Sequence, residues 1–200
     1  MALFRLLDLT SGSIEIDGCN ITQVPLDILR SRVVALPQQA CFLNGSIRRN
    51  IDPAHRSTDN AIITALTKVG LWKIISSHGT LHSPLDPDIL SHGQKQLFCL
   101  ARAMLVKCKI LVLDEATSSL DKNTDQLMQR LIRSEFADCS IICVAHRLQN
   151  IADFDMVAVM DGGRMVELGC PTELLTQSSS MFGKLYNEQR LDDMPGRVFE

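Results

Sequence analysis

A short, wholly apolar segment that ends in two carboxylates constrains the fold more than any other feature of the sequence. Residues 110–113 read Ile-Leu-Val-Leu, and Asp114 and Glu115 follow directly. A strand that is apolar on both faces is typical of a parallel sheet covered on both sides. Residues 140–144 repeat the pattern after a segment that Asp121 can cap as a helix. This alternation of strands and helices predicts an α/β fold, a sheet flanked by helices.

Capping and turn residues predict further elements around these two strands. Pro25 can open a short helix, and residues 32–36 are typical of a strand that Pro37 stops. Two apolar runs around Gly162 and Gly163 predict a β-hairpin over residues 156–168. Other helices are expected over residues 1–7, from a cap at Ser57 or Thr58 to Gly70, over 71–77, from a cap at Ser91 to 106, and after a cap at Thr172. We expect a mobile C-terminal tail over residues 190–200.

The charge balance excludes several classes of partner. The chain carries 20 Lys and Arg against 23 Asp and Glu, a formal net charge of −3. Because basic runs are absent from the sequence, it lacks the electrostatic footprint of a nucleic-acid-binding protein or of one held on anionic lipid. No apolar stretch approaches the roughly 18 residues of a membrane span, so we expect no transmembrane segment in these residues. An anionic ligand would have to be held by local groups.

Asp114 and Glu115 are the first candidates for chemistry. In α/β sheets, ligands bind at the carboxyl ends of the strands, where both residues are predicted to lie. One carboxylate can hold the water shell of Mg²⁺ while its neighbour orients an attacking water, as phosphoryl transfer requires. The alternative is that the pair begins a turn or caps a helix, and for an isolated apolar-Asp-Glu sequence this is the more common case.

The segment Leu90-Ser-His-Gly-Gln94 is the second candidate. A serine hydroxyl, a glycine that lets backbone N–H groups approach closely, and a helix N-terminus together make an anion-binding site. Serine is also a common N-cap without any ligand. The ordered combination with the acidic strand that follows is what favours a functional interpretation.

Taken together, these segments resemble the nucleotide-binding domain of an ATP-binding cassette (ABC) transporter, in particular the second, C-terminal domain of multidrug-resistance-associated (C subfamily) exporters. The similar segments cover most of the chain to about residue 189. They are residues 90–94 with the LSGGQ signature, 110–115 with Walker B and its glutamate, 118–121 with the D-loop, Pro37-Gln38 with the Q-loop, 144–147 with the H-loop, and 43–53 with the segment after the Q-loop.

The resemblance implies a P-loop NTPase-like fold, the cofactors ATP and Mg²⁺, and a role for each matching residue. The implied domain spans residues 1–189 and contains a helical signature subdomain over about 50–105. Glu115 would be the general base or the residue that positions water, and His146 would contact the γ-phosphate. Gln38 and Asp114 would hold Mg²⁺, and Gln38 would also couple to the transmembrane domains. Ser91, Gly93 and Gln94 would clamp ATP bound to a second nucleotide-binding domain, and Asp121 would act across that dimer interface.

The sequence also departs from the family. No Gly-x-x-x-x-Gly-Lys-Ser/Thr occurs in the 200 residues, so they lack the Walker A phosphate-binding loop. The turn Thr10-Ser-Gly12 resembles the one after the P-loop helix of the family, which implies that Met1 lies inside that helix and that the chain is truncated at its N-terminus. Without the P-loop strand we expect a less stable fold and negligible Mg-ATPase activity from these residues alone. His92 replaces a small or apolar residue of the signature.

Three hypotheses for function follow. The first is an ATPase domain of an exporter at the cytoplasmic face of a membrane, with a second nucleotide-binding domain and transmembrane domains as partners. The second is a non-hydrolysing binding module that docks on a complete nucleotide-binding domain. The third, a chromosome-maintenance or DNA-repair ATPase, is set aside because the interval between Gln38 and Ser91 is too short for the coiled coil inserted there in those proteins.

Overall fold

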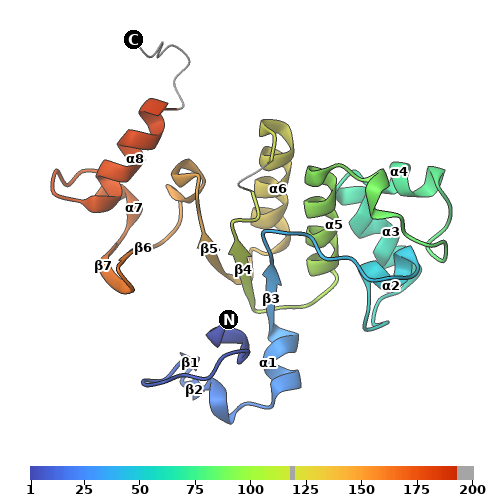
Figure 1. The fold of residues 1–200 in the computed structure, drawn as a ribbon, viewed down its shortest axis with the longest axis horizontal. Helices are drawn as coiled ribbons and strands as arrows, with labels where there is room; N and C mark the ends of the chain where they lie inside the picture. The colour runs from blue at the N-terminus through green and yellow to red at the C-terminus, as the bar shows by residue number, and fades with distance from the viewer. Residues whose placement is uncertain (118–119, 193–200) are drawn as a thin grey trace. The chain divides into compact units, whose positions relative to one another are not determined.

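The computed structural model describes residues 1–117 and 120–192 (Figure 1). Ser118 and Ser119 of the expected D-loop, and residues 193–200 of the expected tail, lie outside the described residues. The chain divides into two compact units, residues 1–142 and the residues from 143 onward, where the sequence predicted one domain over residues 1–189.

A parallel sheet organises the first unit and confirms the predicted α/β class. Strand β3 (Val33–Leu36) runs parallel to β4 (Ile110–Asp114), with Val33 opposite Ile110 and Leu36 opposite Leu113. The strand order is β3-β4-β5, where β5 is Ser140–Val144. The side chains of Leu111 and Leu113, which share one face of β4, are 0% and 3% exposed, so that face is covered as predicted. Ile110 and Val112 on the other face are half-buried.

Strand β5 departs from that prediction. Ile142 and Val144 are 46% and 51% exposed, although the sequence predicts a strand covered on both faces. The two residues are two positions apart, so they share one face of the strand. Within the described residues that face of β5 is not covered. An apolar sequence predicts a strand but does not show which of its faces is packed.

Helix α5 (His92–Met104) is the central helix of the first unit. Figure 1 shows it between β3 and α3, and it also contacts α2 and α6. Because neighbours surround it, a continuous run from Gln96 to Ala101 is buried. The other helices of this unit are α1 (Leu26–Arg32), α2 (Ile47–Ile51), α3 (Asp59–Lys68), α4 (Trp72–Ser77) and α6 (Lys122–Glu135), with single 3₁₀ turns η1 (Ala2–Phe4), η2 (Ile21–Gln23) and η3 (Pro87–Ile89).

The N-terminal segment differs from the expected helix over residues 1–7. It forms the single turn η1, which Arg5 ends in a left-handed conformation with φ of 49°. The Arg5 side chain donates to the carbonyls of Ile21 and Val24, at 3.2 and 2.7 Å. Apolar residues of this segment pack beside η2 and α1, and the short antiparallel pair β1 (Glu15–Ile16) and β2 (Cys19–Asn20) follows.

The second unit is built on the predicted β-hairpin. Strands β6 (Val157–Asp161) and β7 (Arg164–Gly169) are antiparallel, and the turn residues Gly162 and Gly163 have φ of 53° and 76°. Positive φ at both turn positions gives the twist that a two-residue hairpin requires. The turn η4 (Leu148–Ile151) and helices α7 (Pro171–Leu174) and α8 (Met181–Asp192) complete the unit, whose core contains Ile151, Val157, Val159, Leu174 and Phe182.

Two predictions at the ends of these helices are wrong. Thr172 lies inside α7, whose N-cap is Cys170, because Pro171 supplies a first helical residue that needs no hydrogen-bond partner for its nitrogen. Helix α8 extends to Asp192, so residues 190–192 of the expected tail are helical. The start of α8 is capped from β7: Glu167 accepts hydrogen bonds from the backbone of Met181 and Phe182, which lower the pKa of its carboxyl group.

Candidate nucleotide-binding site

Gln38 and Glu115 meet at the carboxyl edge of the sheet. Gln38 stands two residues after β3 and Glu115 directly after β4, and the register that pairs Leu36 with Leu113 brings the two strand ends together. The Gln38 Nε2 group donates a hydrogen bond of 2.8 Å to Glu115 Oε2. Two of the residues predicted from distant parts of the sequence are therefore in direct contact.

The backbone of Glu115 is in an unusual conformation. Its φ is 50°, in the left-handed region that residues other than glycine rarely occupy and that costs on the order of 1–3 kcal/mol. The strand therefore ends at Asp114, and the alternation of side chains across the sheet stops there. Asp114 is exposed and Glu115 is half-buried. Two adjacent carboxylates thus have different surroundings, as a division between metal binding and water activation requires.

The oxygen donors at this edge fit Mg²⁺ shared with a phosphate. The Gln38 amide nitrogen, and not its oxygen Oε1, contacts Glu115, so Oε1 is a candidate ligand, and Asp114 supplies a carboxylate next to Glu115 in the chain. Mg²⁺ commonly takes one or two protein oxygens and completes its shell with water and substrate phosphates. No group of three or more His, Cys, Asp and Glu side chains that could hold a metal ion occurs in the described part of the chain. Gln38 and Asp114 offer two oxygen donors of the kind that such a Mg²⁺ takes.

The start of α5 is held by a reciprocal cap. Gln94 N donates to Ser91 Oγ at 3.3 Å, and Ser91 N donates to Gln94 Oε1 at 2.9 Å. This arrangement satisfies two backbone donors and fixes the Ser91 oxygen as an acceptor, so that the hydroxyl hydrogen can be donated outward. The first-turn N–H groups of His92 and Gly93 have no carbonyl partner within the helix. The N-cap interpretation of Ser91 is confirmed, and the geometry leaves donors that an anion could use.

Gly93 lies where α5 meets the start of α6. A Cβ atom added to Gly93 would lie 3.1 Å from Thr124 Cγ2 and 3.6 Å from Leu120 Cδ2. The contact with Thr124 is tight and would make that side chain shift by a few tenths of an ångström, whereas the distance to Leu120 is an ordinary contact. Helix packing therefore favours a small residue at position 93, in addition to any approach of a ligand to its backbone.

Asp121 caps α6, the simpler of the two interpretations open to it. Its Oδ1 accepts hydrogen bonds from the backbone of Asn123 and Thr124, at 3.0 and 3.1 Å, and its Oδ2 accepts one of 2.6 Å from Thr124 Oγ1. The Thr124 hydrogen bonds lower the pKa of the Asp121 carboxyl group. Thr124 thus connects Asp121 with the neighbourhood of Gly93.

His146 belongs to the second unit, in the segment after β5, and its side chain is exposed. Gln189 of α8 fixes this segment from both sides: its Nε2 donates to the His146 carbonyl, and its Oε1 accepts from Leu148 N at 2.6 Å. Sequence reasoning missed Gln189, because nothing in a polar helix end marks one glutamine as a clamp. It also missed Gln96, which could have been noticed as a polar residue directly before the apolar run 97–101.

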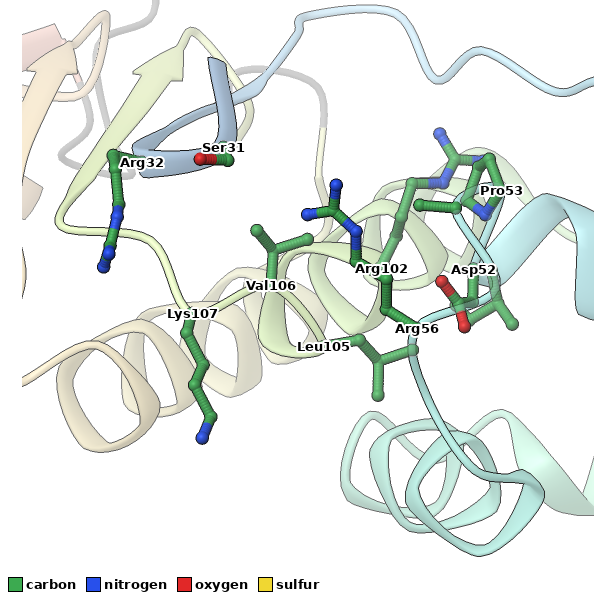
Figure 2. Close-up of a pocket in the computed structure, with 11 residues that line it drawn as sticks. Ser31, Arg32, Asp52, Pro53, Arg56, Arg102, Leu105, Val106 and Lys107 are labelled. Atoms are coloured by element: carbon green, nitrogen blue, oxygen red, sulfur yellow. The ribbon is translucent and has the colours of Figure 1, made fainter. Parts of the chain in front are cut away.

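A separate pocket lies at the opposite, amino edge of the same two strands. It has a volume of about 620 Å³, and Figure 2 shows the basic side chains of Arg32, Arg56, Arg102 and Lys107 around it. Arg102 is fixed there by donating to the Asn50 and Cys41 carbonyls, at 2.8 and 3.1 Å. None of the residues predicted to bind nucleotide or metal lines this pocket. The pocket is therefore distinct from the candidate site.

Comparisons with known proteins support the family resemblance that the sequence motifs indicate. The family model described as "ABC transporter" matches residues 1–118. "ABC multidrug transporter B" of Aspergillus fumigatus is 49% identical over 186 residues, which are 93% of this chain and 13% of that protein. "ABC transporter C family member 13" of Oryza sativa subsp. japonica is 45% identical over 190 residues, which are 94% of this chain and 13% of that protein.

A solved structure shares the fold. "Structure of a bacterial Atm1-family ABC exporter with ATP bound" superposes with a TM-score of 0.84 at 30% identity, covering 94% of this chain and 34% of that one. The present chain therefore spans about an eighth of the length of the curated relatives and a third of this exporter chain. Within residues 1–117 and 120–192, every helix is too short or too polar to span a lipid bilayer. The motifs, the fold and the family match agree, and the chain belongs to the ABC transporter family.

Proposed function

We propose that these residues form the Walker B, Q-loop and signature parts of an ATP-hydrolysing domain of an ABC exporter. The observation that carries the proposal is the 2.8 Å hydrogen bond between Gln38 and Glu115 at the carboxyl edge of β3 and β4. The similarity of the chain to a C family member supports a place in that subfamily. The presence of Glu115 after Asp114 supports its second, catalytically competent domain.

The residues at the carboxyl edge divide the work of hydrolysis. Glu115 orients the attacking water and accepts its proton, and the bond from Gln38 holds the carboxylate in place. Asp114 and the Gln38 amide oxygen would hold Mg²⁺, and the ion would supply positive charge that neutralises the phosphates of ATP. The exposed His146 contacts the γ-phosphate.

The start of α5 binds ATP that a second nucleotide-binding domain holds. The hydroxyl of Ser91 and the first-turn N–H groups of His92 and Gly93 would donate to the γ-phosphate of ATP held by a second nucleotide-binding domain, and Gln94 would hold Ser91 in place for this contact. Asp121 acts at the same dimer interface. The domain works at the cytoplasmic face of a membrane, where its transmembrane partners move the exported substrate.

The sequence lacks Walker A within these 200 residues, and this sets a second candidate beside the first. The chain could act without hydrolysis, as a module that docks its signature helix on a complete nucleotide-binding domain. The intact cap of Ser91 favours this candidate, because the signature side needs no P-loop of its own.

A graft tests the catalytic assignment. Residues 1–192 replace the matching part of a complete ABC nucleotide-binding domain, and Mg-ATP turnover is measured with and without Glu115→Gln. We expect kcat to fall about 10²- to 10⁴-fold with ATP affinity nearly unchanged, because the variant removes a base and keeps the shape. A variant that turns over ATP like its parent would refute the role of Glu115.

Titration tests the docking alternative. The 200-residue chain is added to a complete nucleotide-binding domain, and the ATP affinity and dimerisation of that domain are followed. If the chain docks, the complete domain should bind ATP more tightly in its presence, and Ser91→Ala should reduce this gain. Lys107→Ala, a change in the basic pocket away from Ser91, is the matched control and should keep the gain. If the chain changes neither property, the docking candidate is wrong.

A further inference from the structure

Gln96 is a buried polar residue with an unusual connection. It lies on α5 five positions after Ser91, and it is 1% exposed, next to the buried Leu97 and Phe98. A side-chain amide that is removed from water needs hydrogen-bond partners. Its partners therefore show what the residue does.

The Gln96 amide reaches across to the loop after β3. Its Nε2 donates to the Gln38 carbonyl at 2.5 Å and is 3.4 Å from the Pro37 carbonyl, positions more than fifty residues earlier in the chain. Its Oε1 is buried and has no hydrogen-bond partner in the described structure. The side chain thus stabilises its surroundings through the amide nitrogen, and that nitrogen is directed at the loop that carries Gln38.

The contacts form a continuous series. Gln96 holds the backbone of Gln38, and the Gln38 side chain in turn donates to Glu115 at 2.8 Å. We propose that Gln96 is a positioning residue that keeps Gln38 in hydrogen-bonding contact with Glu115. This inference rests on the proposed function, in which Gln38 and Glu115 share the chemistry at the carboxyl edge.

Helix α5 links Ser91 at its start to the Gln38–Glu115 pair at the edge of the sheet. Ser91 and Gln96 lie on the same rigid helix, about 7.5 Å apart along its axis at 1.5 Å per residue. The helix that offers Ser91 to a partner's nucleotide is therefore the helix that fixes Gln38 beside Glu115. A shift of α5 would move the Gln38 carbonyl through the buried amide.

NMR of the 200-residue chain tests the proposal without nucleotide. The side-chain NH₂ signals of Gln38 are assigned with Gln38→Ala, and Glu115→Ala defines their position when the acceptor is lost. In Gln96→Met, which keeps the length of the side chain and removes the donor, we expect these signals to move at least half of the way to the Glu115→Ala position. Leu100→Ala, a buried change on the same helix, is the matched control for general loosening, and we expect it to leave the signals in place.

Three results would overturn the proposal. Unchanged Gln38 signals in a folded Gln96→Met variant would show that the loop is held without Gln96. An equal movement in Leu100→Ala would reduce Gln96 to a packing residue. If Gln96→Met does not fold, Gln96→Asn retains the amide on a shorter side chain, and unchanged Gln38 signals in it would equally refute the proposal. Because no ATP is used, failure of the NMR test is distinct from failure of the turnover test of Glu115→Gln.

Discussion

Strands β4 and β5 are alike in sequence and different in surroundings. Both are five-residue, mainly apolar segments of one sheet, yet Leu111 and Leu113 of β4 are at most 3% exposed, whereas Ile142 and Val144 of β5 are 46% and 51% exposed. β4 lies between β3 and β5, while β5 is the last strand in the described order. An apolar run thus predicts a strand, and its neighbours decide how much of it is buried.

The difference matters for the candidate site. The buried Leu111 and Leu113 anchor β4 in the core directly before Asp114 and Glu115, and this packing sustains the strained backbone of Glu115. β5 leads to His146, whose segment is fixed instead by Gln189 of α8. Glu115 in the first unit and His146 in the second are therefore held by different means, core packing for Glu115 and a side-chain clamp for the His146 segment.

Leu111→Ala is expected to have the largest effect. Removing a fully buried side chain from β4 leaves a cavity and lowers the free energy of unfolding by about 2–5 kcal/mol. Urea unfolding measures the change, and Ile142→Ala in β5 is the matched control with an expected loss below about 1 kcal/mol. Equal losses in the two strands would show that they are packed alike.

The thiol of Cys143 tests whether the second face of β5 is packed. Cys143 lies against the core of the second unit, and burial raises its pKa to about 11. At pH 8 about one thiol in a thousand is then ionised. We expect Cys143 to be alkylated at least about tenfold more slowly than the exposed Cys19, as followed by mass spectrometry of digested protein. Comparable rates would mean that both faces of β5 are open.

Asp121 allows a pH test of the helix that joins the two strands. Hydrogen bonds from Thr124 lower the pKa of its carboxyl group from the ordinary 3.8, so the ionised form stabilises the fold. This contribution is complete above pH 3.8 and is lost as the pH falls through the lower pKa of the folded state. We expect Asp121→Asn, which keeps a good cap, to have a lower Tm than the wild type near pH 7 and the same Tm at strongly acidic pH. A difference that does not depend on pH would show that the charge of Asp121 is not what stabilises α6.

Val144→Thr is expected to have the smallest effect. The residue is half-exposed, and threonine keeps the branched shape that strands favour, so the free energy of unfolding should change by about 0.5 kcal/mol or less. Thermal unfolding measures it. A large loss would reveal a partner for this face of β5.

Local patterns were sufficient for much of the fold. The strands β3 and β4, the hairpin of β6 and β7, and the caps Ser91 and Asp121 are all confirmed, because each depends on residues close together in the chain. The expected helix over residues 1–7 is a single turn instead, since Arg5 bonds to distant carbonyls that periodicity cannot include.

The family, the order of the motifs and the residues that carry the proposed chemistry could all be inferred before folding was considered, because these properties reside in residue types and their spacing. Three contacts could be seen only in the folded chain: Gln38 donates to Glu115, Gln96 donates to the Gln38 carbonyl, and Thr124 lies tightly against position 93. All three have one cause. Hydrogen bonds and steric limits act over a few ångströms, and folding brings together groups that lie tens of residues apart in the chain.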